Sequence, residues 1–177
     1  MRALADAERI WRFLEALGDR AREEAHVYLA GGATAVLYGW RASTVDVDLK
    51  IVPDTSSLLQ SIPELKEAFE INVELASPDD FIPALPGWEE RSPFIARKGL
   101  LSFHHYDLAA QALAKIERGH EQDLRDAEEM VRRRLVRPAD LARCYEQIEP
   151  SLYRYPAIDP NSFRRAVEEF LARQRAG

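Results

Sequence analysis

The chain has 177 residues, 46% of them hydrophobic and 31% charged, which is the balance of an ordinary globular protein. Its formal net charge of −6 argues against a broad electrostatic grip on nucleic acid. A single cysteine, Cys144, excludes an internal disulfide and fits a cytoplasmic location. There is no run of about 20 apolar residues to span a membrane, so we expect no membrane association.

The first third of the chain predicts a helix, a strand and a short helix in succession. Apolar residues recur at helical spacing over 3–24, and the run Val27–Ala30 predicts a buried strand. Gly31 and Gly32 follow directly, before a short helix over 33–38. A glycine turn at a helix N-terminus brings backbone N–H groups close to an anion, so we predict that both glycines hold phosphate. The alternative is that the glycines form a tight turn that needs positive φ, and this interpretation is compatible with phosphate binding.

Segment 45–52 carries the main chemical signal. Asp46 and Asp48 alternate with apolar residues that we expect to face the core, namely Val45, Val47 and Leu49. Two carboxylates about 5 Å apart repel by roughly 3 kcal/mol at an effective dielectric near 20, which favours a cation between them. Mg²⁺ (or Mn²⁺) binds one or two carboxylates and completes its shell with water and substrate phosphates. We therefore predict that Asp46 and Asp48 bind the metal of a phosphoryl- or nucleotidyl-transfer site, against the alternative of a solvated edge strand.

The middle of the chain predicts further strands. A helix is predicted over 57–69, broken or restarted near Pro63, and a strand over 71–75 with Asn72 and Glu74 on one face. Prolines and glycine over 83–92 predict a surface loop, and 94–105 predicts a hairpin.

From Tyr106 onward the pattern is helical, with helices predicted over 108–118, 121–134, 139–148 and 162–175, and an extended connector at 150–160. We therefore predict an α+β fold. Residues 1–106 would form a core with a mixed sheet of four or five strands and flanking helices, and residues 107–177 a helical section packed on it, in two domains or one.

The order strand, Gly-Gly, short helix and Asp-x-Asp strand resembles the nucleotidyltransferase superfamily of the polymerase-beta type. The closer likeness is to its small prokaryotic branch of abortive-infection toxin nucleotidyltransferases and related uncharacterised families. That branch places an Arg and a Thr between the glycines and the aspartates, matched here by Arg41 and Thr44. The resemblance implies a nucleotidyltransferase-like sheet and nucleotide contacts by these two residues. Arg41 would pair a phosphate or extend to solvent, and Thr34 is a further candidate for a hydroxyl contact with phosphate.

The resemblance also implies a third acid and a later motif. Members often place an acid on a neighbouring strand as general base or second metal ligand, and Glu74 is the candidate, unless it is an ordinary outward polar residue. In the toxin-like branch a Lys that meets the triphosphate precedes an Asp-rich stretch of the next helix that helps build the site. Lys115, Asp123 and Asp126 match this motif. The family's Arg-Asp pair is Gln122-Asp123 here, so the equivalent aspartate stays open, and ordinary helix-surface charge is the alternative.

Two other polar groups have less specific interpretations. The basic run Arg132–Arg134, with Arg137, is either favourable charge at a helix C-terminus or a contact for RNA phosphates. His104 and His105 end a predicted strand without a second His/Cys cluster, so we predict no zinc site.

The resemblance implies Mg²⁺-dependent transfer of a nucleoside monophosphate from a nucleoside triphosphate to an RNA or protein hydroxyl. It also implies, as biological role, the toxin of a toxin–antitoxin pair with an antitoxin chain as partner. A non-catalytic nucleotide-binding or antitoxin-like regulatory module of the same fold is the alternative, and the helical section as a dimer or partner interface is a third. No DNA-binding motif is evident.

Overall fold

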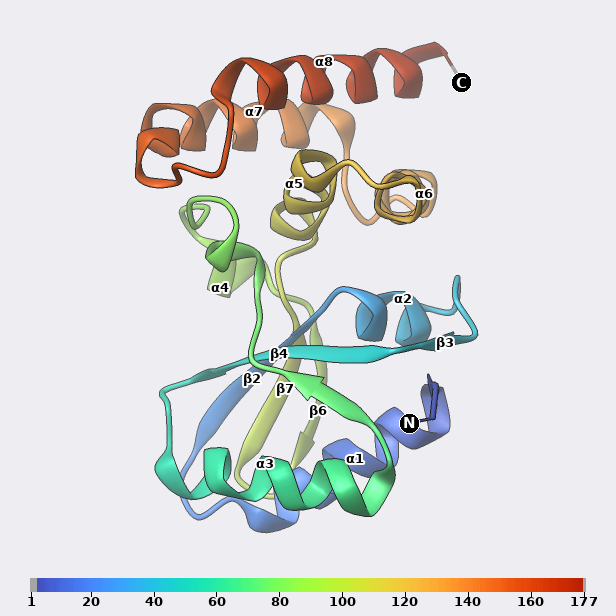
Figure 1. Ribbon diagram of the computed structural model, residues 1–177, viewed down its shortest axis with the longest axis vertical. Helices are drawn as coiled ribbons and strands as arrows, with labels where there is room; N and C mark the ends of the chain where they lie inside the picture. Colours follow the sequence, from blue (N-terminus) through green and yellow to red (C-terminus); the bar gives the residue numbers. More distant parts are fainter. Residues whose placement is uncertain (1–2, 177) are drawn as a thin grey trace. The chain divides into compact units, whose positions relative to one another are not determined.

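The computed structural model describes residues 3–176, which form two compact units, one α+β and one α-helical (Figure 1). The sheet unit comprises residues 3–77 and 92–105, and the helical unit comprises residues 78–91 and 106–176. Residues 78–91, expected in the first section, belong to the helical unit because of specific side-chain contacts. The Trp88 ring stacks on Tyr106 with centroids 4.3 Å apart, and Arg91 pairs with Asp107 at 2.8 Å.

The sheet unit is built on a mixed five-stranded sheet in the order β5-β4-β2-β7-β6. Its strands are β2 (Ala25–Ala30), β4 (Asp46–Val52), β5 (Asn72–Glu74), β6 (Phe94–Lys98) and β7 (Leu101–His105). Strand β2 pairs antiparallel with β4 and parallel with β7, β4 pairs parallel with β5, and β6–β7 is an antiparallel hairpin. Strands β1 (Ala5–Asp6) and β3 (Ser43–Thr44) form a separate pair. The expected mixed sheet is confirmed.

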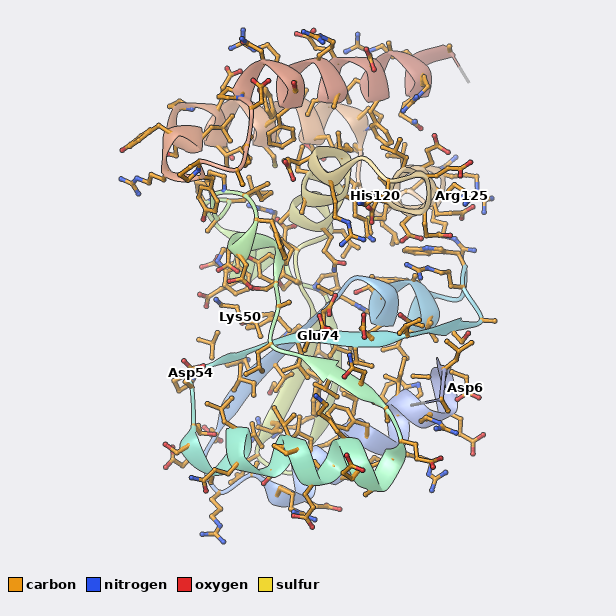
Figure 2. All side chains as sticks on the ribbon, viewed as in Figure 1. Asp6, Lys50, Asp54, Glu74, His120 and Arg125 are labelled. Carbon is orange, nitrogen blue, oxygen red and sulfur yellow. The ribbon has the colours of Figure 1, made fainter. Side chains whose placement is uncertain are left out.

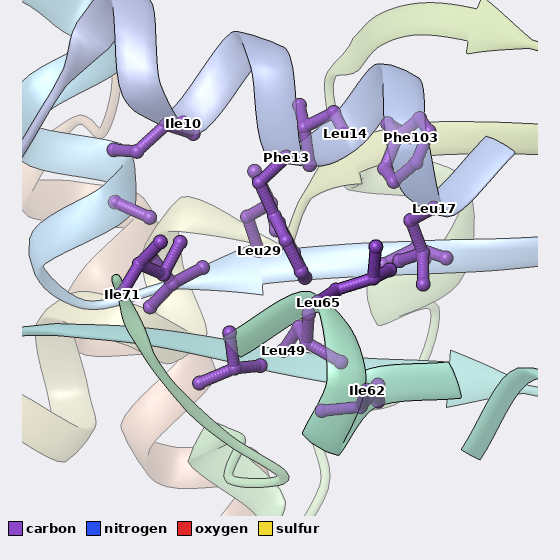
Figure 3. Packing of buried hydrophobic residues seen from close by; sticks show 14 of the residues in the cluster. Ile10, Phe13, Leu14, Leu17, Leu29, Leu49, Ile62, Leu65, Ile71 and Phe103 are labelled. Atoms are coloured by element: carbon purple, nitrogen blue, oxygen red, sulfur yellow. The ribbon is translucent and has the colours of Figure 1, made fainter. Parts of the chain in front are cut away.

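Two helices, α1 (Ala7–Arg20) and α3 (Ser56–Phe69), cover one face of this sheet. Asp6 is the N-cap of helix α1, and its carboxylate accepts a hydrogen bond from the Arg9 backbone N–H at 2.9 Å. Its apolar stripe packs on the strands (Figure 3). The residues that α1 and α3 contribute to this core are Ile10, Phe13, Leu14, Leu17, Leu58, Ile62 and Leu65.

Strand β4 alternates as expected between this core and the opposite face of the sheet. Val47 and Leu49 are fully buried, whereas Asp46 and Asp48 are half-buried. The expectation for Val45 is wrong, because its side chain is 65% exposed. Val45 links β3 to β4, which belong to two different sheets, so the alternation of β4 begins only after it.

Helix α3 runs without a break through Pro63, so the predicted interruption is wrong. An interior proline costs a helix about 3 kcal/mol. Burial of a leucine or isoleucine side chain contributes about 1.5–3 kcal/mol, so the apolar residues of α3 offset that cost. Those residues are Leu58, Ile62 and Leu65.

The helical unit contains the four predicted helices, each within two residues of its expected ends, and three shorter ones. The long helices are α5 (Leu108–Arg118), α6 (Glu121–Arg132), α7 (Pro138–Ile148) and α8 (Pro160–Ala176), and the short ones are η1 (Pro78–Asp80), α4 (Trp88–Arg91) and η2 (Glu149–Arg154). Helix α4 replaces residues 88–91 of the expected loop, and η2 replaces part of the expected connector. Leu85, in the remaining loop, and Leu152 of η2 are buried. Within residues 3–176, no helix has the length and apolar character needed to cross a bilayer.

Candidate functional site

Three acidic side chains gather on the sheet face opposite α1 and α3. In the parallel pairing of β4 with β5, Asp46 lies opposite Asn72 and Asp48 lies opposite Glu74. Directly opposite residues share a face, so Asp46, Asp48 and Glu74 form one group, here named the carboxylate cluster. The Asn72 amide donates a hydrogen bond to Asp46 Oδ1 and lies 3.4 Å from Glu74 Oε1. Asn72 thereby orients two of the three acids; Glu74, labelled in Figure 2, is exposed.

Gly31 stands next to this cluster. It follows Ala30, the last residue of β2, which pairs with Asp48 on β4. The backbone of Gly31 has φ +63°, and a Cβ atom there would lie 2.8 Å from Asp48 Oδ2. Glycine is therefore required twice, by the backbone conformation and by the close approach of the carboxylate. The structure brings Gly31 and Asp48 together.

Gly32 and Thr44 contact each other and mainly support the fold beside the site. A Cβ atom on Gly32, the first residue of helix α2 (Gly32–Tyr38), would lie 1.9 Å from Thr44 Oγ1. The Thr44 hydroxyl donates to the Asp46 carbonyl oxygen at 3.0 Å, and its side chain is buried. These contacts hold the start of β4 against α2. A contact of Thr44 with a nucleotide therefore competes with a hydrogen bond that the fold already uses.

Thr34 and Arg41, both predicted to contact phosphate, differ in burial and in the hydrogen bonds they make. Thr34 is fully buried, and its hydroxyl lies 3.4 Å from the Leu29 carbonyl oxygen and 3.0 Å from His105 Nδ1. The predicted contact of Thr34 with a phosphate does not fit this placement, because its polar group is enclosed by protein. Arg41 is half-buried after α2, where its backbone N–H donates to the Ala35 carbonyl oxygen at 3.3 Å.

His105, the buried partner of Thr34, makes the stability of the fold sensitive to acid. Burial lowers the pKa of His105 from 6.5 to about 4, so the unfolded chain takes up this proton first as pH falls. The His105 contribution to stability is complete above pH 6.5 and is lost as pH falls toward 4. We expect the free energy of unfolding to drop by about 2 kcal/mol from this group between pH 7.5 and 5.

Urea unfolding at both pH values measures this loss in the wild type and in His105→Gln. The variant should lose less stability over this interval, whereas His120→Gln, at an exposed site, should keep the wild-type dependence. An unchanged pH dependence in His105→Gln would contradict the assignment.

The later motif forms a buried charge cluster in the helical unit. Lys115 Nζ of α5 lies 2.9 Å from Asp126 Oδ2 and 3.6 Å from Asp123 Oδ1, both on α6. Asp123 also pairs with Arg118 at 2.8 Å, and the Gln122 amide donates to Asp126 at 3.0 Å. Asp126 is fully buried. The three predicted residues thus come together, and they join α5 to α6.

The basic run at the end of α6 is largely engaged in surface ion pairs. Arg132 and Arg133 pair with Glu129 at 2.6 and 3.0 Å, and Arg137 pairs with Asp140 at 2.7 Å. These pairs compensate part of the positive charge, which favours the interpretation as ordinary helix-end charge over an RNA contact.

Several side chains on the site face were missed by sequence reasoning. Lys50 follows Asp48 by two residues, is half-buried on the same face, and continues the alternation that identified the aspartates. Its neighbours across the sheet are Tyr28, His104 and Phe94. The lysine was visible in the strand pattern, but the aromatic neighbours depend on the register of three strand pairs.

The carboxylates fit a Mg²⁺ ion that arrives with phosphate better than a metal held by protein alone. Among the side chains of residues 3–176, no group of three or more His, Cys, Asp or Glu is placed to hold a metal ion. Mg²⁺ needs only one or two carboxylates when substrate phosphates complete its shell. Asp46 and Asp48 offer two, and the absence of a side chain at Gly31 lets its backbone approach the Asp48 carboxylate closely.

The chain was compared with protein-family models, with curated proteins and with solved structures, and none of the three comparisons finds a match. The chemical interpretation of the site therefore rests on its own residues. They offer carboxylates, an amide that orients them and a glycine corner, all on one side of one sheet.

Proposed function

We propose that this protein has a nucleotidyltransferase-like fold and transfers a nucleoside monophosphate from a nucleoside triphosphate to an acceptor hydroxyl, with Mg²⁺ or Mn²⁺. The observation that carries the proposal is the approach of the Gly31 backbone to Asp48, beside Asp46 and Glu74 on one sheet face. Acids that lie close together on one sheet face repel each other and so disfavour the folded state. Beside a glycine whose backbone approaches them, the arrangement fits the binding of a metal ion and phosphate better than a structural role.

The residues of the sheet unit have distinct parts in the proposed reaction. Asp46 and Asp48 hold the metal, which when bound neutralises charge on the triphosphate, and Asn72 keeps Asp46 in place. The phosphates lie over the Gly31 backbone. Glu74, the exposed acid, takes the proton from the acceptor hydroxyl. A bond forms between the acceptor oxygen and the α-phosphorus, the bond from that phosphorus to the oxygen bridging the β-phosphate breaks, and pyrophosphate leaves.

Other parts of the proposal rest on the resemblance in the sequence. They are a contact of Arg41 with phosphate, charge neutralisation on pyrophosphate by Lys115 with Asp123 and Asp126, and the role of toxin paired with an antitoxin chain.

Labelling tests the proposal directly. The protein is incubated with Mg²⁺, labelled nucleoside triphosphates and either total RNA or total protein, and incorporation is compared with that of Asp46→Ala/Asp48→Ala. We expect incorporation by the wild type and loss of nearly all of it in the double variant. Absence of incorporation by the wild type, or equal incorporation by both proteins, would remove the proposal.

Gly31 should be more sensitive to substitution in activity than in folding. Gly31→Ala and Gly39→Ala both place alanine at a positive φ, and each should lose about 1–3 kcal/mol of stability. At Gly39 a Cβ atom would meet nothing within 4 Å, whereas at Gly31 it would approach Asp48 Oδ2. We therefore expect Gly31→Ala to lower labelling by at least about 10-fold beyond Gly39→Ala, one factor of ten being about 1.4 kcal/mol in the barrier. Labelling rates and urea unfolding of the two variants check this, and equal rates would argue against a ligand at Gly31.

A further inference from the structure

A row of ring side chains crosses the sheet beside the carboxylate cluster. Lys50 of β4 pairs with Tyr28 of β2, Tyr28 with His104 of β7, and His104 with Phe94 of β6. The rings of Tyr28 and His104 are stacked with centroids 5.0 Å apart, and Phe94 meets His104 edge to face at 5.7 Å. Tyr28, His104 and Phe94 are here named the aromatic row.

The aromatic row lies on the same face as the metal-binding pair. Lys50, which heads the row, follows Asp48 by two residues on β4, a separation of about 7 Å along the strand. From Tyr28 on β2 to Phe94 on β6 the row crosses two strand spacings, or about 10 Å. The row therefore begins next to the carboxylate cluster and leads away from it to the edge of the sheet.

The rings of the row differ in exposure: those nearest the sheet edge are accessible to a ligand, and the innermost ring is buried behind them. Phe94 is 63% exposed on the edge strand, and His104 is half-buried. Tyr28 is 3% exposed and backs the His104 ring. His26, which is exposed, lies against the row with its Nδ1 3.0 Å from His104 Nε2. The rings therefore hold one another in place, with Tyr28 buried and the His104 and Phe94 rings accessible.

Rings presented on a sheet face are a recurrent solution for binding unpaired bases. Bases stack on Phe, Tyr, Trp and His side chains, and each stacked base adds appreciably to affinity without regard to sequence. Successive bases in a stacked strand are about 3.4 Å apart, and the accessible rings of His104 and Phe94 have centroids 5.7 Å apart, so the two rings have room for more than the single base of one nucleotide. Lys50 adds one positive charge at the end nearest the aspartates, where a phosphate would be held.

We propose that the aromatic row binds unpaired bases of a single-stranded RNA whose hydroxyl is the acceptor of the transfer. This inference rests on the proposed function for the identity of the acceptor, and it favours RNA over a protein side chain because several planar rings are aligned in one row. With a net charge of −6, the chain should gain affinity from stacking more than from phosphate neutralisation, so binding should depend only weakly on salt.

Binding of two labelled oligoribonucleotides to the full chain tests the inference without any transfer. One is decaadenylate, and the other is a ten-unit RNA backbone without bases. We expect the wild type to bind decaadenylate at least about 10-fold tighter, and Phe94→Ala to reduce this preference by about 5-fold or more, as loss of one stacked base predicts. Phe94→Trp should keep the preference. Phe81→Ala removes an aromatic ring that is 54% exposed in the helical unit and should bind like the wild type.

The outcomes separate this inference from the proposed function. Equal binding of the two oligonucleotides by the wild type, or an unchanged preference in Phe94→Ala, overturns the role of the row even where labelling is observed. Labelling of protein in place of RNA, unaffected by Phe94→Ala, overturns it in the same way. A preference that depends on Phe94 supports the row, and failure of the wild type to label any acceptor then removes only the proposed function.

Discussion

Asp48→Asn is expected to lower nucleotide transfer by about 10³-fold or more, equivalent to about 4 kcal/mol in the barrier, and at the same time to stabilise the metal-free protein. The amide keeps the shape of the side chain but loses the charge that holds the metal. Asp46, Asp48 and Glu74 share one face of the sheet, so removing one of their three negative charges should raise the free energy of unfolding of the metal-free protein by up to about 1 kcal/mol. Opposite effects on activity and stability are what a functional site under electrostatic strain predicts.

The measurements are labelling rates, urea unfolding in the presence of a chelator, and thermal unfolding with and without Mg²⁺ and triphosphate. The added ligands should raise the Tm of the wild type and leave that of Asp48→Asn nearly unchanged, since only a protein that binds them is stabilised. Asp54→Asn removes an exposed charge just beyond β4 and should resemble the wild type in each measurement. Loss of stability in Asp48→Asn without metal would instead assign Asp48 a structural role.

Lys115→Met is expected to destabilise the protein by about 3–5 kcal/mol. The substitution leaves Asp126 buried without its cation, since Lys115 Nζ lies 2.9 Å from Asp126 Oδ2. Lys115→Met/Asp126→Asn removes both charges and should recover most of the loss, because the desolvated carboxylate is gone as well. Urea unfolding of the wild type, the double variant and the single variants Lys115→Met and Asp126→Asn gives the coupling energy between the two residues.

Arg125→Met provides the control, because Arg125 is exposed on α6, the helix that carries Asp126, and is labelled in Figure 2. It should change stability by less than about 0.5 kcal/mol. Labelling by the double variant then separates two roles of the cluster. A stable double variant without activity supports the part of Lys115 in transfer, and a stable, active one shows that the cluster only joins α5 to α6. A small loss in Lys115→Met would contradict the buried ion pair itself.

The sequence alone was sufficient for features that follow from local periodicity. Alternation along β4 placed Asp46 and Asp48 opposite the core because successive side chains of a strand point to opposite faces. The helical spacing of apolar residues located α5 to α8 within two residues at each end. Glycine after an apolar strand marked the corner at Gly31, because few other residues adopt its backbone conformation.

Only the tertiary structure decided which residues meet, because contacts between strands depend on register and not on any local period. Register placed Glu74 beside Asp48 and aligned Tyr28 with His104 and Phe94.

Packing also separated the two glycines and decided the burial of Thr34 and Val45. Gly31 lies against Asp48, whereas Gly32 lies against Thr44. Thr34 is buried against His105, and Val45 is exposed between two sheets. The burial of each of these side chains is set by neighbours that are distant in the chain, and for that reason the sequence could name Asp46 and Asp48 as candidates but not their surroundings.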